Sequence, residues 1–519
     1  MRRILTASDR ALLLEMSDLD ESLRMLPALL AANIPGVTEL VPAVRTILVH
    51  FDPGVVTAES LQTRLLSIEP SEELEGSEES VEIAVRYGGE DLATVAELLA
   101  VTERELIERH QAATWRVAFS GFAPGFGYLI CDDPLFDVPR RSSPRTRIPA
   151  GSVALAGRFS GIYPRESPGG WQLIGRTDTA MWDLDRDPPA LLSPGTAVRF
   201  TATDREVVMR AGATSKPVAS QNSLEVVRPG LQLLVQDLGR PGMASQGVSS
   251  AGAADREALR EANRAVGNEQ NTASLEIAGG GAVLRFRGPT VASLSGALAT
   301  ATLTGSEVDF DRPFAVEDGD ELRIGGAAEG MRIVLAIRGG LAIDPVLDSC
   351  SADTLAGLGP DPLQAGDVIP LHGPSSAPHP VERTRAPRRR LPKSGEITEL
   401  RIILGPRDDW FTDSALQALC SQEWQVTPRS DRIGVRLAGD ALERVRNDEL
   451  DSEGAVTGAI QVPADGQPVL FLADHPLTGG YPIIGSVIDS DLDLAGQLPP
   501  AARVRFRVEP AEAGEHASQ

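Results

Sequence analysis

A short glycine-rich phrase occurs twice in this chain, once in each half. Pro168–Gly175 reads PGGWQLIG, and Thr478–Gly485 reads TGGYPIIG. Two glycines before an aromatic residue and an apolar run are typical of backbone that passes close to another group and then enters a strand. Arginines lie upstream of both copies, in Ser143–Ile148 (SPRTRI) and in Thr427–Ile433 (TPRSDRI). Because both features occur twice and in the same order, they predict two modules of one general design within a single chain.

The composition allows several domains and excludes some classes of partner. With 519 residues, of which 42% are hydrophobic, the chain is long enough for about three or four domains. The net charge of −24 repels nucleic acid and anionic lipid, so we expect neither as a partner. No apolar run is long enough to span a membrane and no secretory signal is present, so we expect a cytoplasmic protein. The 3 scattered cysteines form no CxxC pair, which predicts no zinc site.

The hydrophobic pattern divides the chain into four folded units. Strands are predicted near 10–15 and 46–51 and helices near 18–33 and 58–66, an alternation that favours a small ferredoxin-like α+β lobe. The predicted divisions are 1–80, this lobe; 81–210, a β-rich unit with two early helices; 211–223, a linker; 224–372, the first β-rich unit of the second half; 373–396, a linker rich in Pro and Arg; 397–508, the second β-rich unit; and 509–519, a disordered tail.

Short strands broken by Pro and Gly dominate the three larger units, a pattern typical of closed or nearly closed β-structure. One helix is predicted in the second half at 254–266, with Gly267 as its left-handed stop. The turn at 317–320 predicts a hairpin that leads into a strand at 322–324. The predicted fold class is therefore a β-rich α+β protein.

The loop at 120–129 is the strongest chemical candidate in the first half. Its glycines, including Gly125, let backbone amides approach a ligand, and its aromatic side chains offer flat walls. The alternative is a bent strand that packs these aromatics into a core. Beyond the first Gly-Gly phrase, Arg176 and Asp178 stand close together, and the arginine can clamp a carboxylate or a phosphate.

The histidines offer two further candidates and no metal centre. Only 6 histidines occur, none of them clustered with other ligands, and the HExxH, GxSxG and P-loop motifs are absent. His110 stands at the predicted end of a helix, where a surface histidine satisfied by the helix dipole is the alternative to a catalytic role. His475 lies beside Asp474 and just before the second Gly-Gly phrase, which makes it the better catalytic candidate.

Several long motifs resemble a known pair of protein families. The first half carries 119–129 (FSGFAPGFGYL), 147–157 (RIPAGSVALAG) and 161–183, and it is similar to the family first labelled allophanate hydrolase subunit 1, which includes the B subunit of 5-oxoprolinase. The second half carries 235–242 (VQDLGRPG) and 458–463 (GAIQVP), and it resembles the subunit 2 family, which includes the C subunit of 5-oxoprolinase and part of urea amidolyase. The resemblance implies cyclophilin-like β-barrel modules, one in the first half and two in the second, and two usually separate subunits fused in one chain.

The resemblance implies two activities, of which the first is our leading hypothesis. A 5-oxoprolinase uses ATP, normally with Mg²⁺, to open the lactam of 5-oxoproline to glutamate together with a third, separately encoded subunit. The alternative is a carboxyltransferase that moves a carboxyl group from carboxybiotin to urea or a related amide. Because neither Lys216 nor Lys393 is flanked by methionines, no biotin is expected on this chain. A second alternative is a non-enzymatic binding protein that regulates a kinase, since relatives of both halves carry names of that kind.

Under the leading hypothesis, the doubled phrase marks two related clefts that face a shared substrate. The oligomeric state, the lactam specificity and the nucleotide site stay open, and a homo-oligomer is compatible with the sequence. No metal ligands are assigned. The predicted catalytic residues are His110, Arg145, Arg147, Arg176, Asp178, Asp474 and His475. The residues predicted to bind the substrate or nucleotide are Phe122, Gly125, Phe126, Tyr128, Tyr163, Gly169, Gly170, Trp171, Arg240, Arg429, Arg432, Thr478, Gly479, Gly480 and Tyr481.

Overall fold

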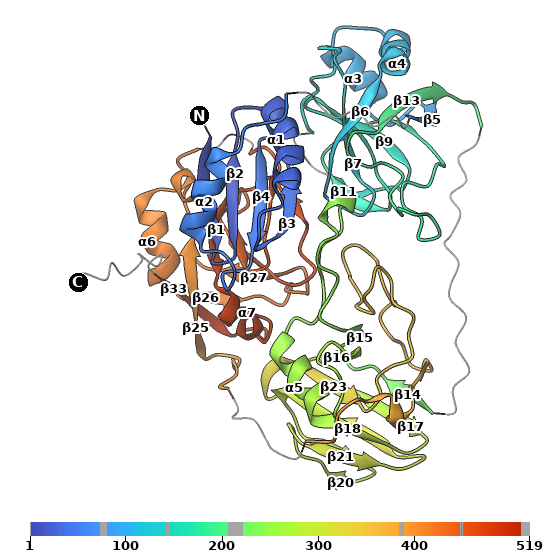
Figure 1. The fold of residues 1–519 in the computed structure, drawn as a ribbon, viewed down its shortest axis with the longest axis vertical. Coiled ribbons are helices and arrows are strands. Elements are labelled where there is room, and N and C mark those ends of the chain that lie inside the picture. Colours follow the sequence, from blue (N-terminus) through green and yellow to red (C-terminus); the bar gives the residue numbers. More distant parts are fainter. Residues whose placement is uncertain are drawn as a thin grey trace.

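Four units follow one another along the chain: a small lobe, a closed barrel, a module of two sheets and a second closed barrel (Figure 1). The computed structural model describes residues 2–72, 80–141, 143, 145–205, 222–382, 389–446, 448 and 450–509. The predicted tail from residue 510 onward lies outside these ranges, as do 211–221 of one predicted linker and 383–388 of the other.

The N-terminal lobe is an antiparallel sheet in the order β1-β2-β4-β3, covered by two helices. Asp18 caps α1 by accepting the Glu21 amide, and Asn33 ends it in the left-handed conformation. The predicted strands and helices are present, whereas β1 and β3 add to them; both are edge strands, whose weaker burial leaves a weaker sequence pattern. The elements are β1 (Arg3–Ser8), β2 (Ala11–Glu15), α1 (Leu19–Ala32), β3 (Val37–Pro42), β4 (Thr46–Phe51) and α2 (Ala58–Ser67).

The two barrels close with the same strand order. When the strands of each barrel are lettered a to g in chain order, both rings read a-f-d-e-c-b-g, with a and g parallel. In the first barrel these letters stand for β5 (Ser80–Tyr87), β6 (Trp115–Ser120), β7 (Gly127–Ile130), β9 (Ser152–Ala156), β10 (Phe159–Ile162), β12 (Gln172–Arg176) and β13 (Ala197–Ala202). In the second they stand for β25 (Ile397–Leu404), β26 (Trp424–Val426), β27 (Gly434–Ala438), β29 (Ala459–Gln461), β30 (Val469–Phe471), β32 (Ile483–Val487) and β33 (Arg503–Val508).

Helices and small ribbons also occupy matching places in the two barrels. Helices follow strand a in both, and a two-stranded ribbon is formed by the c–d and e–f connections of each barrel. Strand b begins in both barrels with a buried tryptophan whose Nε1 donates to a carbonyl five residues earlier. The elements are α3 (Leu92–Leu98), α4 (Glu103–Ala112), β8 (Arg145–Ile148) and β11 (Ser167–Gly169) in the first barrel; and α6 (Asp413–Ser421), β28 (Glu453–Gly454), β31 (Thr478–Gly479) and α7 (Asp489–Ala495) in the second.

This correspondence confirms that two modules share one design, but it corrects one part of the prediction. The Gly-Gly phrases are equivalent, since Gly169 ends β11 and Gly479 ends β31. The upstream arginines are not equivalent. Arg145 lies on β8 in the c–d connection, whereas Arg429 and Arg432 lie in the b–c connection. The sequence similarity of the two arginine segments therefore does not reflect structurally equivalent positions.

The remaining unit is built from two sheets packed face to face rather than from a closed barrel. Its core lies between a six-stranded and a five-stranded sheet. The turn at 317–320 joins β21 to β22, which pair into different sheets, so the predicted hairpin is wrong. The chain therefore passes from one sheet to the other at this turn. The elements are β14 (Ser223–Arg228), β15 (Gln232–Gln236), α5 (Arg256–Val266), β16 (Ser274–Ala278), β17 (Val283–Arg287), β18 (Thr290–Leu298), β19 (Ala301–Leu303), β20 (Ser306–Glu307), β21 (Pro313–Val316), β22 (Glu321–Ile324), β23 (Glu329–Ile337) and β24 (Val368–Pro370).

The N-terminal lobe lies beside the second barrel, although the two are far apart in the sequence (Figure 1). Strand β2 is buried on both faces because its odd and even side chains enter different cores. One core lies under α1 and α2, and the other is shared with the second barrel. Arg407 of the barrel donates to Glu453 and, at 2.9 Å, to Glu15 of β2, so a buried ion network crosses this boundary.

Candidate active site

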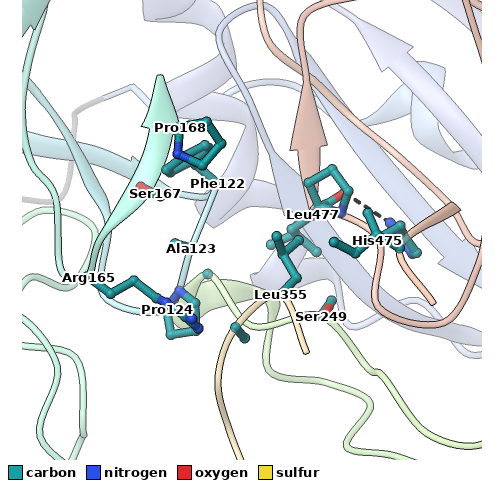
Figure 2. Close-up of a pocket in the computed structure, with 14 residues that line it drawn as sticks. Phe122, Ala123, Pro124, Arg165, Ser167, Pro168, Ser249, Leu355, His475 and Leu477 are labelled. Atoms are coloured by element: carbon teal, nitrogen blue, oxygen red, sulfur yellow. Dashed lines mark hydrogen bonds between the residues drawn. The ribbon is translucent and has the colours of Figure 1, made fainter. Parts of the chain in front are cut away.

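A pocket of about 190 Å³ lies where the two barrels and the two-sheet module meet (Figure 2). All three units supply its walls. The lining residues are Phe122, Ala123, Pro124, Arg165, Ser167 and Pro168 from the first barrel; Gly247, Ser249, Leu355 and Ala356 from the two-sheet module; and Ile433, His475, Pro476 and Leu477 from the second barrel.

Each barrel lines the pocket with the same two connections. The b–c connection contributes Phe122 in the first barrel and Ile433 in the second. The e–f connection contributes Arg165 in the first and His475 in the second. Equivalent loops of two related barrels therefore meet around one space, but their side chains differ.

His475 presents a neutral imidazole at this pocket. Its Nδ1 donates to the carbonyl oxygen of Pro476 at 2.9 Å, which leaves Nε2 with a free lone pair. The ring stacks on Phe471, with centroids 5.8 Å apart and planes 13° apart. Burial lowers the pKa of His475, although the Pro476 carbonyl and Asp474 oppose the shift. The group can therefore accept a proton near neutral pH.

Asp474 and Arg432 are buried in an ion network behind His475. Arg432 donates to Asp474 at 2.9 and 3.1 Å and also binds Glu276 of the two-sheet module. Thr354 of that module donates to Asp474 through its amide at 2.9 Å and its hydroxyl at 2.6 Å. These contacts place Asp474 and Arg432 between units, where they position the loop of His475 instead of facing a ligand.

Asp353 stands at the start of the turn that meets both barrels. Its carboxylate accepts the amides of Leu355 at 3.0 Å and Ala356 at 2.8 Å, and the hydroxyl of Ser249 at 3.2 Å. Burial, and then the charge of Asp474, raise the pKa of Asp353 to about 6. This turn was not predicted from the sequence, because no motif marks it.

The predicted arginines of the first barrel lie outside the described lining of the pocket. Arg145 binds Asp91 in a fork at 2.8 and 2.9 Å, so its guanidinium is already satisfied. Arg147 pairs with Glu166 at 2.6 Å on the surface, and Arg176 donates to the carbonyl oxygen of Ala150 at 3.2 Å. Arg176 and Asp178 are not buried. We conclude that these side chains bind other residues of the first barrel or face solvent, and that none of them lines this pocket.

His110 is a core residue, so it is not the surface histidine that was the alternative to the predicted catalytic role. It is fully buried, stacks on Phe200 with centroids 4.4 Å apart, and has both ring nitrogens close to hydroxyl groups. These are the hydroxyls of Tyr87 at 2.8 Å and Ser160 at 3.3 Å. Burial lowers the pKa of His110 to about 3. A neutral, enclosed imidazole with occupied nitrogens is not presented to any substrate.

The predicted aromatic walls divide into core and pocket residues. Phe126, Tyr128, Tyr163 and Trp171 pack against one another in a buried cluster, as the core alternative predicts. Phe122 lies at the edge of this cluster and reaches the pocket. Gly125 has a positive φ of 75°, and its amide donates to Gln246 of the two-sheet module at 3.1 Å, so the loop docks one unit on the next.

The glycine phrases make close backbone approaches, as predicted, but their paired glycines are not among the described lining residues of the pocket. A Cβ at Gly169 would collide with the hydroxyl of Tyr163, and the carbonyl of Gly170 accepts the Arg141 amide at 2.9 Å. Gly479 lies against Gln461, and Gly480 faces Arg140. Of the remaining predicted binding residues, Thr478 is buried near Gly121, Arg240 is buried and bound to the carbonyl oxygen of Ser351, and Arg429 and Tyr481 are exposed.

Metal ligands and membrane helices are both missing from the part of the chain that the structure describes. No group of three or more His, Cys, Asp or Glu side chains comes together there that could hold a metal ion. Within the same ranges, no helix is long and apolar enough to cross a membrane.

Arg165 is the main pocket residue that was not predicted from the sequence. It stands three residues before the first Gly-Gly phrase, inside the motif 161–183. The signal that could have found it is the alignment of the two phrases, because it places Arg165 and His475 in the same connection.

Two family models match this chain in separate regions. The model of the carboxyltransferase domain, subdomains A and B, matches residues 246–508, and the model of subdomains C and D matches residues 2–192. The C subunit of the 5-oxoprolinase of Escherichia coli K12 is 34% identical over 286 residues, which cover 54% of this chain and 90% of that protein. The B subunit of the 5-oxoprolinase of Escherichia coli O157:H7 is 40% identical over 172 residues, which cover 32% of this chain and 79% of that protein.

Similarity also extends over nearly the whole chain. A crystal structure of the protein TTHA0988 matches with a TM-score of 0.83 and 36% identity, covering 96% of this chain and 99% of that one. The urea amidolyase of Lachancea kluyveri is 32% identical over 308 residues, 55% of this chain but only 17% of that protein. The curated relatives are thus enzymes or components of enzymes. The chain belongs to the carboxyltransferase-domain family, and it joins in one polypeptide the counterparts of the B and C subunits of 5-oxoprolinase.

Proposed function

We propose that this protein is the fused B and C component of an ATP-dependent 5-oxoprolinase, which opens 5-oxoproline to glutamate together with a separate third subunit. The observation that carries the proposal is the shared pocket. Phe122 and Arg165 belong to the half related to the B subunit, and His475 and Leu355 belong to the half related to the C subunit. A site walled by both halves accounts for their fusion.

The pocket suits a small lactam better than a whole nucleotide. Its volume of about 190 Å³ lies below the range of roughly 300–1,000 Å³ that is usual for larger ligands. Apolar side chains such as Phe122 and Leu355 can pack on a five-membered ring, and polar groups at the walls can orient it. We therefore assign the lactam to this pocket and leave the nucleotide, with its Mg²⁺, outside it.

His475 supplies the acid–base group of the proposed reaction. An amide is a poor electrophile, and ATP, when bound, supplies the phosphoryl group that makes the carbonyl carbon reactive. The free lone pair of His475 Nε2 can accept the proton of a water molecule whose oxygen bonds to this carbon. The ring C–N bond then breaks, its nitrogen takes up a proton as the amine of glutamate, and the phosphoryl group leaves as inorganic phosphate. Asp474, through Arg432 and Thr354, keeps the loop of this histidine in place. Burial of the site strengthens each polar contact with the substrate.

The proposal is tested by reconstitution. The purified chain is mixed with the third subunit, ATP and 5-oxoproline, and glutamate is measured over time. The same third subunit with the separate B and C subunits from Escherichia coli serves as the positive control. We expect glutamate only when ATP and both proteins are present. Absence of ATP-dependent glutamate with an active third subunit contradicts the proposal.

A carboxyltransferase is the second candidate, and the description of the matching family models favours it. Since no biotin is expected on this chain, carboxybiotin would come from another polypeptide. The distinguishing result is decarboxylation of added carboxybiotin without ATP, stimulated by urea or another amide.

A further inference from the structure

One wall of the shared pocket carries a guanidinium with an unsatisfied nitrogen. Nη1 of Arg165 is buried and has no hydrogen-bond partner among the residues that the structure describes. The hydroxyl of Ser167, on the same strip of chain, is buried and also unpaired within those residues. Buried polar atoms nearly always have partners, so these two atoms of pocket residues need one, which a ligand or an ordered water would supply.

The two-sheet module holds this guanidinium against its own backbone. A Cβ at Gly357 would collide with Nη1 of Arg165, and Gly357 also has a positive φ of 64°. The same turn binds the loop of His475, because Thr354 donates to Asp474. A single turn of chain therefore sets Arg165 and His475 relative to each other.

The pocket is asymmetric in charge although its loops are equivalent. Arg165 is the one cationic side chain among the described lining residues, and His475 in the matching connection is neutral. In Figure 2, Arg165 extends from the connection before β11 toward Pro124, while His475 lies on the side of the second barrel. An anionic group of a bound molecule would therefore be drawn to the side of the first barrel.

We propose that Arg165 binds the carboxylate of the lactam substrate and gives this pocket its preference for acidic over neutral lactams. A guanidinium matches a carboxylate in a fork of two hydrogen bonds, and the hydroxyl of Ser167 is available on the same wall. With the carboxylate held there, the lactam ring lies among Phe122, Leu355 and His475. The inference rests on the proposed function for the identity of the lactam, whereas the position of the cation comes from the pocket itself.

The test is a binding measurement that needs neither ATP nor the third subunit. Calorimetry compares 5-oxoproline with 2-pyrrolidinone, the same lactam without the carboxylate, on the wild-type chain and on three variants. Arg165→Gln should weaken 5-oxoproline about 10- to 100-fold and leave 2-pyrrolidinone unchanged. Arg165→Lys keeps the charge but loses the fork, so it should fall between wild type and Arg165→Gln. Arg199→Gln, at an exposed arginine on β13 of the same barrel, is the matched control and should change the affinity for neither ligand.

Two binding results would contradict the proposal that Arg165 binds the carboxylate of the lactam. The first is a wild-type chain that binds 5-oxoproline no better than 2-pyrrolidinone. An equal loss of both ligands in Arg165→Lys, which preserves the fold best, would assign Arg165 a structural role only. The reconstitution assay reports separately on the reaction. If 5-oxoproline binding depends on Arg165 but no glutamate forms, the proposed function is refuted and the role of Arg165 stands. If glutamate forms but binding does not depend on Arg165, only the role of Arg165 is refuted.

Discussion

The two barrels have the same strand order, but they present different side chains to the pocket. Strand b begins with Trp115 in the first and Trp424 in the second, and the Nε1 of each donates to a carbonyl at 3.1 and 3.0 Å. The carbonyls belong to His110 and Leu419, which shows that the position of His110 is a core position in both barrels. In the e–f connections, by contrast, the first barrel places Arg165 at the pocket and the second places His475.

The comparison shows which features the two related barrels share and which differ between them. Hydrogen bonds and packing inside each barrel constrain the backbone, so the glycine phrases and the tryptophans stay alike. The pocket loops make contacts between units, and these contacts differ: Arg165 lies against Gly357, whereas Asp474, beside His475, accepts the hydroxyl of Thr354. The repeated phrase in this chain therefore marks equivalent backbone, and the two barrels differ in the pocket residue three positions before it, Arg165 in one and His475 in the other.

The largest expected effect concerns the b–c connections, which carry a buried charge only in the second barrel. Arg432→Ala should destabilise the protein by about 3–5 kcal/mol, because it leaves Asp474 and Glu276 buried without their cation. Chemical denaturation measures the change. Arg429→Ala, an exposed arginine of the same connection, should stay within about 0.5 kcal/mol of wild type. Equal effects in the two variants would show that the network does not hold the units together.

The histidines should separate activity from stability. His475→Ala should lower the kcat of the reconstituted enzyme by about 100-fold or more, because a positioned general base contributes that much. Its unfolding free energy should change less than that of His110→Ala, which opens a cavity in the core of the first barrel. Steady-state kinetics and thermal unfolding are compared for both variants. If His110→Ala instead lost activity while keeping its stability, the assignment of the two histidines would be reversed.

Asp353 predicts a pH dependence at the turn that meets both barrels. Its raised pKa, about 6, means that the folded protein binds the proton more tightly than the unfolded chain. The stability from this group is fully present below the unfolded pKa of about 4 and is lost as the pH rises through about 6. Asp353→Asn should remove up to about 2 kcal/mol of this dependence. Urea unfolding at about pH 4.5 and about pH 7.5 measures it on either side of the folded pKa. If Asp353→Asn showed the same difference in unfolding free energy between the two pH values as wild type, Asp353 would not be the source of the pH dependence.

The smallest expected effect tests whether the equivalent tryptophans stabilise the two barrels to the same extent. Trp115→Phe and Trp424→Phe each remove one buried hydrogen bond to a carbonyl and should each cost about 1–2 kcal/mol. Thermal unfolding of the two variants should give similar shifts. A cost confined to one barrel would mean that the shared tryptophan supports only one of the two cores.

Parts of the site were within reach of the sequence and parts were not. His475 and Phe122 were predicted from a motif and a glycine-rich loop, and both line the pocket. The predicted arginines of the first barrel failed because spacing gives no information on ion pairs, and Asp91 satisfies Arg145 from far away in the chain. The turn at 353–358, which meets both barrels, was not predicted because it has no motif of its own. Its part in the pocket depends on contacts with two other units.

By itself, the sequence determined the doubled design, the lobe and its helices, the predominance of strands and the family. These features depend on periodicity and on glycines, which act locally. Only the tertiary structure decided which side chains line the pocket. Burial and pairing placed His110 in a core, bound Arg145 to Asp91, and brought Arg165 and His475 to one pocket. Those outcomes depend on contacts between distant residues, and contacts of that kind exist only in the folded chain.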